Sequence, residues 1–141
     1  MIDPNQKTLA LDYGTRRIGV AIQYGSLAEP LEVIGNKTDS KAIAGEVTLG
    51  ALNRIKTLCQ EHGVNQILVG LSEGEMAKMS QKFGAAVQAT CQIPVIYWDE
   101  TLSSVTVAAR LRAAGQGQRI GRGPIDQFAA ALILEDWLES Q

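Results

Sequence analysis

Three acidic residues stand where carboxylates could do chemistry. Asp12 closes an apolar stretch, Glu100 follows another, and Asp126 lies at the start of a segment with helical character. Carboxylate oxygens are the ligands that Mg²⁺ and Mn²⁺ prefer in proteins. Two such ions in one site can hold the attacking water and the leaving oxygen of a phosphodiester. If folding brings the three acids together, we expect Asp12 to bridge two metal ions and the other two acids to hold one each.

Other catalytic chemistries have little support in the composition. The single histidine, His62, argues against Ser-His-Asp, Cys-His and poly-histidine zinc sites within one chain. The two cysteines, Cys59 and Cys91, lack metal-ligand spacing and are too few for a disulfide framework, which fits a reduced cytoplasm. Any catalysis must therefore depend on carboxylates. Glu73 and Glu75 are candidates for a further ligand, although acids at a helix start have an ordinary structural role.

Arginines gather in two segments that could meet a polyanion. The formal net charge is −2, but Thr101–Ile125 carries four arginines and no acidic residue, so this segment is +4 and the remainder is −6. Arginines position nucleic-acid phosphates without reading base sequence, and such binding weakens steeply with salt. A solvated helix face with a loop is the ordinary alternative. The candidate phosphate contacts are Arg16, Arg17, Arg119 and Arg122, the last two in a glycine-rich stretch.

The order of elements predicts the fold. Apolar runs indicate strands at 8–12, 18–24, 32–34, 66–70 and 94–98, and helical spacing indicates helices at 40–62, 76–90, 104–114 and 124–139. A turn at Tyr13–Arg17 leaves the first strands to pair as antiparallel hairpins, whereas helical crossovers make the later strands parallel. This predicts an α/β fold of the ribonuclease H-like type: a mixed five-stranded sheet flanked by helices. A flavodoxin-like fold is the alternative, but it needs a helix between the first two strands.

This arrangement would bring the three acids to one edge of the sheet. The carboxyl ends of parallel strands meet there, and α/β folds tend to bind ligands at that edge. Asp126 shares a helical face with Ala129, Ala130 and Ile133, so we expect it to face the sheet. Three carboxylates in one place would repel one another unless a cation joins them.

Length and hydropathy indicate how many domains the chain has and where the protein is located. A chain of 141 residues with 45% hydrophobic and 20% charged residues is typical of one globular domain, here 1–141. The apolar run Ala129–Leu134 is far shorter than the roughly 18 residues of a membrane span. The first residues lack the charged and apolar regions of a secretory signal. We therefore expect a cytoplasmic location and no membrane partner.

Four motifs resemble the YqgF family, whose members are ribonuclease H-like, related to Holliday junction resolvases and regarded as pre-16S rRNA nucleases. The motifs are Asp12–Ala21, Leu68–Leu71, Trp98–Ser104 and Asp126–Leu134, in the family's order over nearly the whole chain. The resemblance implies that Asp12, Glu100 and Asp126 are metal ligands. It also implies a divalent metal, a cytoplasmic location and maturation of the 5′ end of small-subunit rRNA. One departure leaves substrate choice open: Ser72–Met76 is shorter than, and different from, the family's Pro and Asn-Met-Asp-Gly-like loop.

Together these features predict a metal-dependent nuclease for structured nucleic acid, foremost the 5′ end of pre-16S rRNA during ribosome biogenesis, with ribosome association as one option. Branched DNA is the alternative substrate, and a noncatalytic binding or assembly factor is the alternative class. A small ATPase lobe is a third hypothesis, because Asp12–Thr15 resembles a phosphate-binding hairpin, but those ATPases need two lobes. The oligomeric state stays open: a symmetric junction calls for a dimer, whereas trimming an RNA end needs one site.

Overall fold

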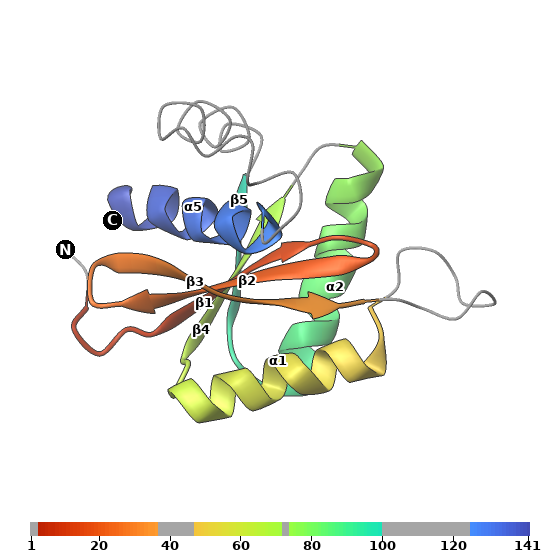
Figure 1. Cartoon of the computed structure of the whole chain (residues 1–141), viewed down its shortest axis with the longest axis horizontal. Helices are drawn as coiled ribbons and strands as arrows, with labels where there is room; N and C mark the ends of the chain where they lie inside the picture. Colours follow the sequence, from red (N-terminus) through yellow and green to blue (C-terminus); the bar gives the residue numbers. More distant parts are fainter. Residues whose placement is uncertain (1–2, 37–46, 72–73, 100–124) are drawn as a thin grey trace.

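The computed structural model describes residues 3–36, 47–71, 74–99 and 125–141, with only the backbone for 125–127. Five strands form one sheet in the order β3-β2-β1-β4-β5 (Figure 1). The strands are β1 (Thr8–Tyr13), β2 (Arg17–Tyr24), β3 (Leu27–Gly35), β4 (Gln66–Leu71) and β5 (Val95–Asp99). Because β1 is central, each of its faces is available for packing against a helix layer.

Strand directions confirm the predicted mixed sheet. The pairs β1–β2 and β2–β3 are antiparallel, whereas β1–β4 and β4–β5 are parallel. The short turn between β1 and β2 leaves no helix between them, which excludes the flavodoxin-like alternative. The carboxyl ends of β1, β4 and β5 therefore lie together at one edge of the sheet.

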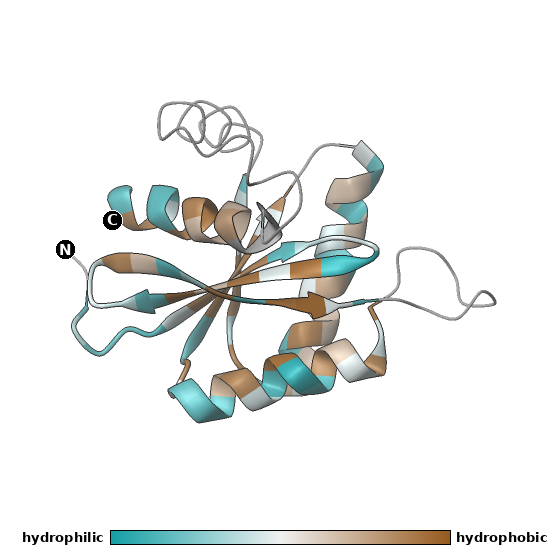
Figure 2. Cartoon of the chain, viewed as in Figure 1, coloured by the Kyte–Doolittle hydropathy of each residue, from teal (hydrophilic) through white to brown (hydrophobic). Residues whose placement is uncertain are grey.

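Helices cover both faces (Figure 1). Helices α1 (Leu49–His62) and α2 (Gly74–Cys91) pack against each other on one face, and α5 (Ile125–Glu139) lies on the other. Alternate residues of β1 serve the two layers: Leu9 and Leu11 belong to the apolar cluster with α1 and α2, and Ala10 belongs to the cluster with α5. Figure 2 shows hydrophobic residues along the central strands and on α5. None of the helices described here is both long and apolar enough to cross a membrane.

The start of α1 differs from the prediction. The apolar stripe predicted a helix from Ser40, but α1 begins at Leu49, and Thr48 has extended backbone angles of φ −76° and ψ 154°. The Thr48 hydroxyl accepts a hydrogen bond of 3.1 Å from the Ala51 N–H, which makes it the N-cap. The helix ends as predicted at Gly63, whose φ of 64° is in the left-handed region.

The third strand extends beyond the predicted 32–34 at both ends. β3 runs through Pro30, which pairs with Ala21, and it holds one extra residue, Leu31, before Glu32, the partner of Val20. β3 lies at the edge of the sheet, where a residue without an N–H is tolerated. The predicted helix at 104–114 and the glycine-rich stretch after it lie outside the described residues.

Candidate active site at the carboxyl edge of the sheet

Asp12 lies one residue before the end of β1 and is half-buried. Its neighbours Leu11 and Tyr13 point into the cluster formed with α1 and α2. Ala10, two residues earlier, packs in the cluster formed with α5. Because side chains alternate along a strand, the Asp12 carboxylate lies on the α5 face, at the carboxyl end of the central strand.

Glycines border Asp12 on both neighbouring strands. Gly19 of β2 is its direct partner, and Gly70 of β4 follows Val69, the partner of Leu11. Both glycines are buried. At these two positions the neighbouring strands carry no side chain on this face, whereas branched apolar side chains fill the opposite one.

Side chains near the end of β5 alternate between the two faces of the sheet. Ile96 and Trp98 pack against the cluster formed with α5. Tyr97 points to the other face, where its hydroxyl donates a hydrogen bond of 3.2 Å to the Gln81 carbonyl of α2. Asp99 ends the strand in register with Leu71 of β4. Glu100, the predicted ligand, comes next in the chain and lies outside the described residues.

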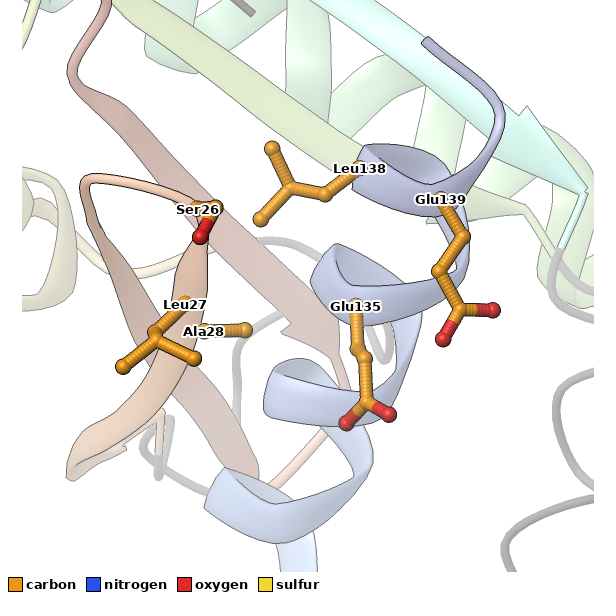
Figure 3. Close-up of a pocket in the computed structure, with 6 residues that line it drawn as sticks. All are labelled: Ser26, Leu27, Ala28, Glu135, Leu138 and Glu139. Atoms are coloured by element: carbon orange, nitrogen blue, oxygen red, sulfur yellow. The ribbon is translucent and has the colours of Figure 1, made fainter.

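A surface pocket fixes the direction in which α5 crosses the sheet. The pocket, of about 460 Å³, lies between the β2–β3 hairpin and the last turns of α5 (Figure 3). Its lining residues are Ser26, Leu27, Ala28, Glu135, Leu138 and Glu139. The hairpin lies at the amino end of β1, because Leu9 pairs with Ile22 just before it. The last turn of α5 is therefore at the amino end of β1, and its first turn, which contains Asp126, lies toward the carboxyl end.

The face of α5 that packs on the sheet is the one predicted to carry Asp126. Ala130 and Ile133, four and seven residues after Asp126, are buried in the α5 cluster. The Asp126 side chain itself lies outside the described part of the chain. The helix position and the buried face are thus confirmed, and the orientation of the carboxylate stays a prediction.

Arg16 and Arg17 end the turn that leads from β1 into β2 (residues 14–17), Arg17 being also the first residue of β2, and both residues are exposed. The turn is tight, because a Cβ on Gly14 would lie 2.5 Å from the Arg17 carbonyl oxygen. A buried residue that the sequence analysis missed, Asn36, makes hydrogen bonds to this turn. A single asparagine after a strand gives no sequence signal of such a role, since its partners lie about twenty residues away. Arg119 and Arg122 lie outside the described residues.

Of the two additional candidate acids, Glu75 is among the described residues. Glu75 is exposed in the first turn of α2, and its carboxylate lies 3.5 Å from the Lys78 ammonium. Glu73 lies outside the described residues. Where side chains are described, no three His, Cys, Asp or Glu residues are grouped so that they could hold a metal ion. Two of the three predicted ligands are not among those side chains.

The fold is that of ribonuclease H-like resolvases. The chain superposes on Thermus thermophilus RuvC in complex with a Holliday junction substrate with a TM-score of 0.60 at 16% identity, covering 96% of this chain and 95% of RuvC. It superposes on the yeast mitochondrial Holliday junction resolvase with a TM-score of 0.54 at 12% identity, covering 98% and 81%. Identities this low establish the shared fold alone.

Sequence comparisons identify the family. A family model described as RuvX, Holliday junction resolvase, matches residues 6–140. The chain is 34% identical over 143 residues to a Geobacillus kaustophilus protein named "putative pre-16S rRNA nuclease", covering 96% of this chain and 99% of the relative. A Chloroflexus aurantiacus protein of the same name is 36% identical over 145 residues, covering 97% and 89%. The chain belongs to the RuvX family, which confirms the motif resemblance and classes it as a hydrolase of phosphodiester bonds.

Proposed function

We propose that this chain is a metal-dependent nuclease that processes the 5′ end of pre-16S rRNA. The observation that carries the proposal is the place of Asp12: a half-buried carboxylate on the α5 face, at the carboxyl end of the central strand, bordered by two glycines. The names of the curated relatives support the RNA substrate. Such a substrate implies work in the cytoplasm on precursor particles of the small ribosomal subunit.

The proposed site combines Asp12, Glu100 and Asp126. Trp98 lies on the α5 face, and two residues further along an extended chain a side chain returns to the same face, which would bring Glu100 to Asp12. The direction of α5 supports the third member, since its first turn lies toward the same edge. Asp12 belongs to β1 and Asp126 to α5, and Glu100 directly follows the last residue of β5 in the chain.

The donor set suits Mg²⁺ or Mn²⁺, because three carboxylates without histidine or thiolate ligands form an oxygen-only environment. We propose that Asp12 bridges two such ions and that Glu100 and Asp126 each hold one. When bound, the ions supply charge stabilisation at the reacting phosphate and a more acidic water. Arg16 and Arg17, together with Arg119 and Arg122, would hold the phosphates on either side of the scissile bond.

A four-way DNA junction is the second candidate substrate. The family description names Holliday junction resolvases, and the Thermus thermophilus RuvC structure holds such a junction. The phosphate contacts proposed here do not distinguish the two substrates, because arginines at the backbone carry no sequence information. The loop at 72–76, which departs from the family pattern, is the place where the substrates would be told apart.

The test is a cleavage assay on both substrates. Pre-16S rRNA with an extended 5′ end and a four-way junction are incubated with the full chain in Mg²⁺, in Mn²⁺ or in chelator. We expect trimming of the RNA that needs metal and is lost in Asp12→Asn, with Glu61→Gln as a control that retains activity, because Glu61 is exposed in the last turn of α1, before the amino end of β4. Cleavage of the junction alone would favour the second substrate. Binding without any cleavage would identify a noncatalytic factor and refute the proposal.

A further inference from the structure

Asn36 is fully buried and joins three parts of the chain. Its Nδ2 donates hydrogen bonds of 3.2 Å to the Gly14 carbonyl and 3.4 Å to the Thr15 carbonyl. Its backbone N–H donates to the Arg16 carbonyl at 2.7 Å. Its Oδ1 accepts a hydrogen bond of 2.8 Å from the Thr48 N–H. The relative exposed area of Asn36 is 0%, so these partners replace water entirely.

These contacts fix the turn between β1 and β2. Three successive carbonyls, of residues 14, 15 and 16, accept hydrogen bonds from this one residue. Through Thr48, the same side chain ties the turn to the N-terminus of α1. A buried amide that loses its partners costs about 1–3 kcal/mol, so the turn has one strongly preferred position.

The turn that Asn36 holds is the one next to the proposed site. It begins two residues after Asp12, and it carries Arg16 and Arg17. The hydrogen bonds from Asn36 to the turn all go to backbone carbonyls and to no arginine side chain. Both arginine residues are exposed to solvent. A residue with these contacts sets where the two guanidinium groups stand relative to the Asp12 carboxylate.

We propose that Asn36 is a positioning residue for nucleic-acid binding, which acts through the turn that carries Arg16 and Arg17. It holds the two arginines where they bind the phosphate backbone in substrate and transition state alike, and it touches neither substrate nor metal. The inference rests on the proposed function, because it assumes that this turn meets the nucleic acid. Because the turn is fixed before the nucleic acid binds, no conformational entropy is lost in ordering it during binding, which favours affinity.

Asn65 provides a matched control at the other end of β1. Its Oδ1 accepts a hydrogen bond of 2.9 Å from the Lys7 N–H, and its Nδ2 donates one of 3.0 Å to the Asn5 carbonyl. Its own N–H donates to the Lys7 carbonyl at 3.0 Å. Asn65 therefore also holds a neighbouring segment through backbone hydrogen bonds, but at the amino end of the strand.

The experiment measures affinity and cleavage separately. Anisotropy with a labelled pre-16S rRNA 5′ fragment gives Kd over a salt series for wild type, Asn36→Ala, Asn36→Asp and Asn65→Ala, and initial rates give KM and kcat. Asn36→Asp keeps the acceptor for Thr48 and removes the donors to the turn, so it isolates the turn contacts and is the fallback if the alanine variant does not fold. We expect both Asn36 variants to raise Kd and KM about tenfold with little change in kcat, and Asn65→Ala to stay within about twofold.

A double-mutant cycle separates positioning from general destabilisation. If Asn36 acts through the two arginines, Asn36→Asp adds little further loss of affinity in an Arg16→Ala/Arg17→Ala background. Full additivity, or an equal loss of affinity in Asn65→Ala at the same melting temperature, would overturn the proposal. Failure of the proposed function gives a different result, because wild type would then bind the RNA without cleaving it or would not bind it at all.

Discussion

The two faces of the sheet are built from different residues. The face covered by α1 and α2 is filled with large apolar side chains from the three central strands, such as Leu11, Val20 and Val69. The face covered by α5 has smaller residues near its middle, including Ala10 and Ala21, and at its carboxyl end it carries Asp12 between two glycines. One face therefore supplies most of the buried apolar volume, while the other provides space for a polar site.

Tyr13 shows how the first face supports the second. Its side chain points away from Asp12 and stacks on Phe83 of α2, with ring centroids 4.5 Å apart and an interplanar angle of 26°. Aromatic pairs of this kind add about 0.5–1.5 kcal/mol beyond the area that they bury. The strand end that bears Asp12 is thus anchored from behind by a contact that takes no part in chemistry.

The largest effect is expected from Asp12→Asn, which changes the α5 face alone. Removing one carboxylate from a three-acid site should lower the cleavage rate about 10³-fold, equivalent to about 4 kcal/mol of barrier. The melting temperature in chelator should fall far less than it does for truncation of a core side chain, because asparagine has nearly the same size as aspartate and leaves no cavity. Initial rates measure the loss of cleavage, and a melting curve measures the stability. A variant that cleaves normally or loses several degrees would break the contrast between the faces.

The reverse result is expected one residue earlier, in Leu11→Ala. Leu11 is fully buried on the α1–α2 face, so its truncation leaves a cavity and should lower the free energy of unfolding by about 2–5 kcal/mol. Below the melting temperature of the variant, kcat should stay within about twofold of wild type, since Asp12 keeps its place. Urea unfolding and initial rates measure the two quantities. Loss of kcat in the folded variant would show that the two faces are not separable.

A smaller effect is expected from Gly84→Ala in α2. A Cβ at this position would lie 2.7–2.8 Å from two ring carbons of Tyr97, so the ring must move and the Tyr97 hydroxyl must shift from the Gln81 carbonyl. We expect a net loss of about 1 kcal/mol, because the packing penalty exceeds the gain in helix propensity.

Gly50→Ala in α1 is the matched control for that substitution. A Cβ there meets no atom of the described chain within 4 Å, so only the helix propensity changes and the protein should gain about 0.5–1 kcal/mol. Urea titrations of both variants give the comparison. Equal effects at the two glycines would contradict the account of α2 packing on β5.

The smallest effect concerns the two thiols of the α1–α2 face. Cys59 is buried, and its hydrogen bond with Cys91, together with burial, raises the pKa of the Cys59 thiol. The same hydrogen bond and the charge of Lys56 lower the pKa of Cys91, which is half-buried. Cys91 should therefore be alkylated by iodoacetamide before Cys59 at pH 7–8, as followed by mass spectrometry. Cleavage should be unchanged after the first alkylation, because both thiols lie away from the α5 face.

Much of this architecture could be predicted because local constraints determine it. The five residues Tyr13–Arg17 permit only a hairpin, and helical crossovers force β4 and β5 to run parallel to β1. The same argument placed Asp12 at the correct edge. The helix faces followed from hydrophobic periodicity, and the strands followed from short apolar runs.

The errors arose where tertiary contacts decide the local structure. The apolar stripe continued upstream of Thr48, but the N–H of Thr48 bonds to Asn36, which is twelve residues away, and the helix begins after it. Pro30 is compatible with β3 because the strand lies at the sheet edge and has a register shift beside this residue, and both features depend on strand pairing. The role of Asn36 was missed for the same reason, since its partners at Gly14 and Thr15 come together with it only in the folded chain.

The central claim is that Asp12, Glu100 and Asp126 hold one metal centre, and the most direct measurement is Mn²⁺ binding by electron paramagnetic resonance. Wild type is titrated beside Asp12→Asn, Glu100→Gln and Asp126→Asn, with Glu61→Gln, at the exposed end of α1, as the control. We predict that each of the three variants binds Mn²⁺ at least about tenfold more weakly, or loses one bound ion, while the control matches wild type. Wild-type Mn²⁺ affinity and stoichiometry in any one of the three would contradict the account.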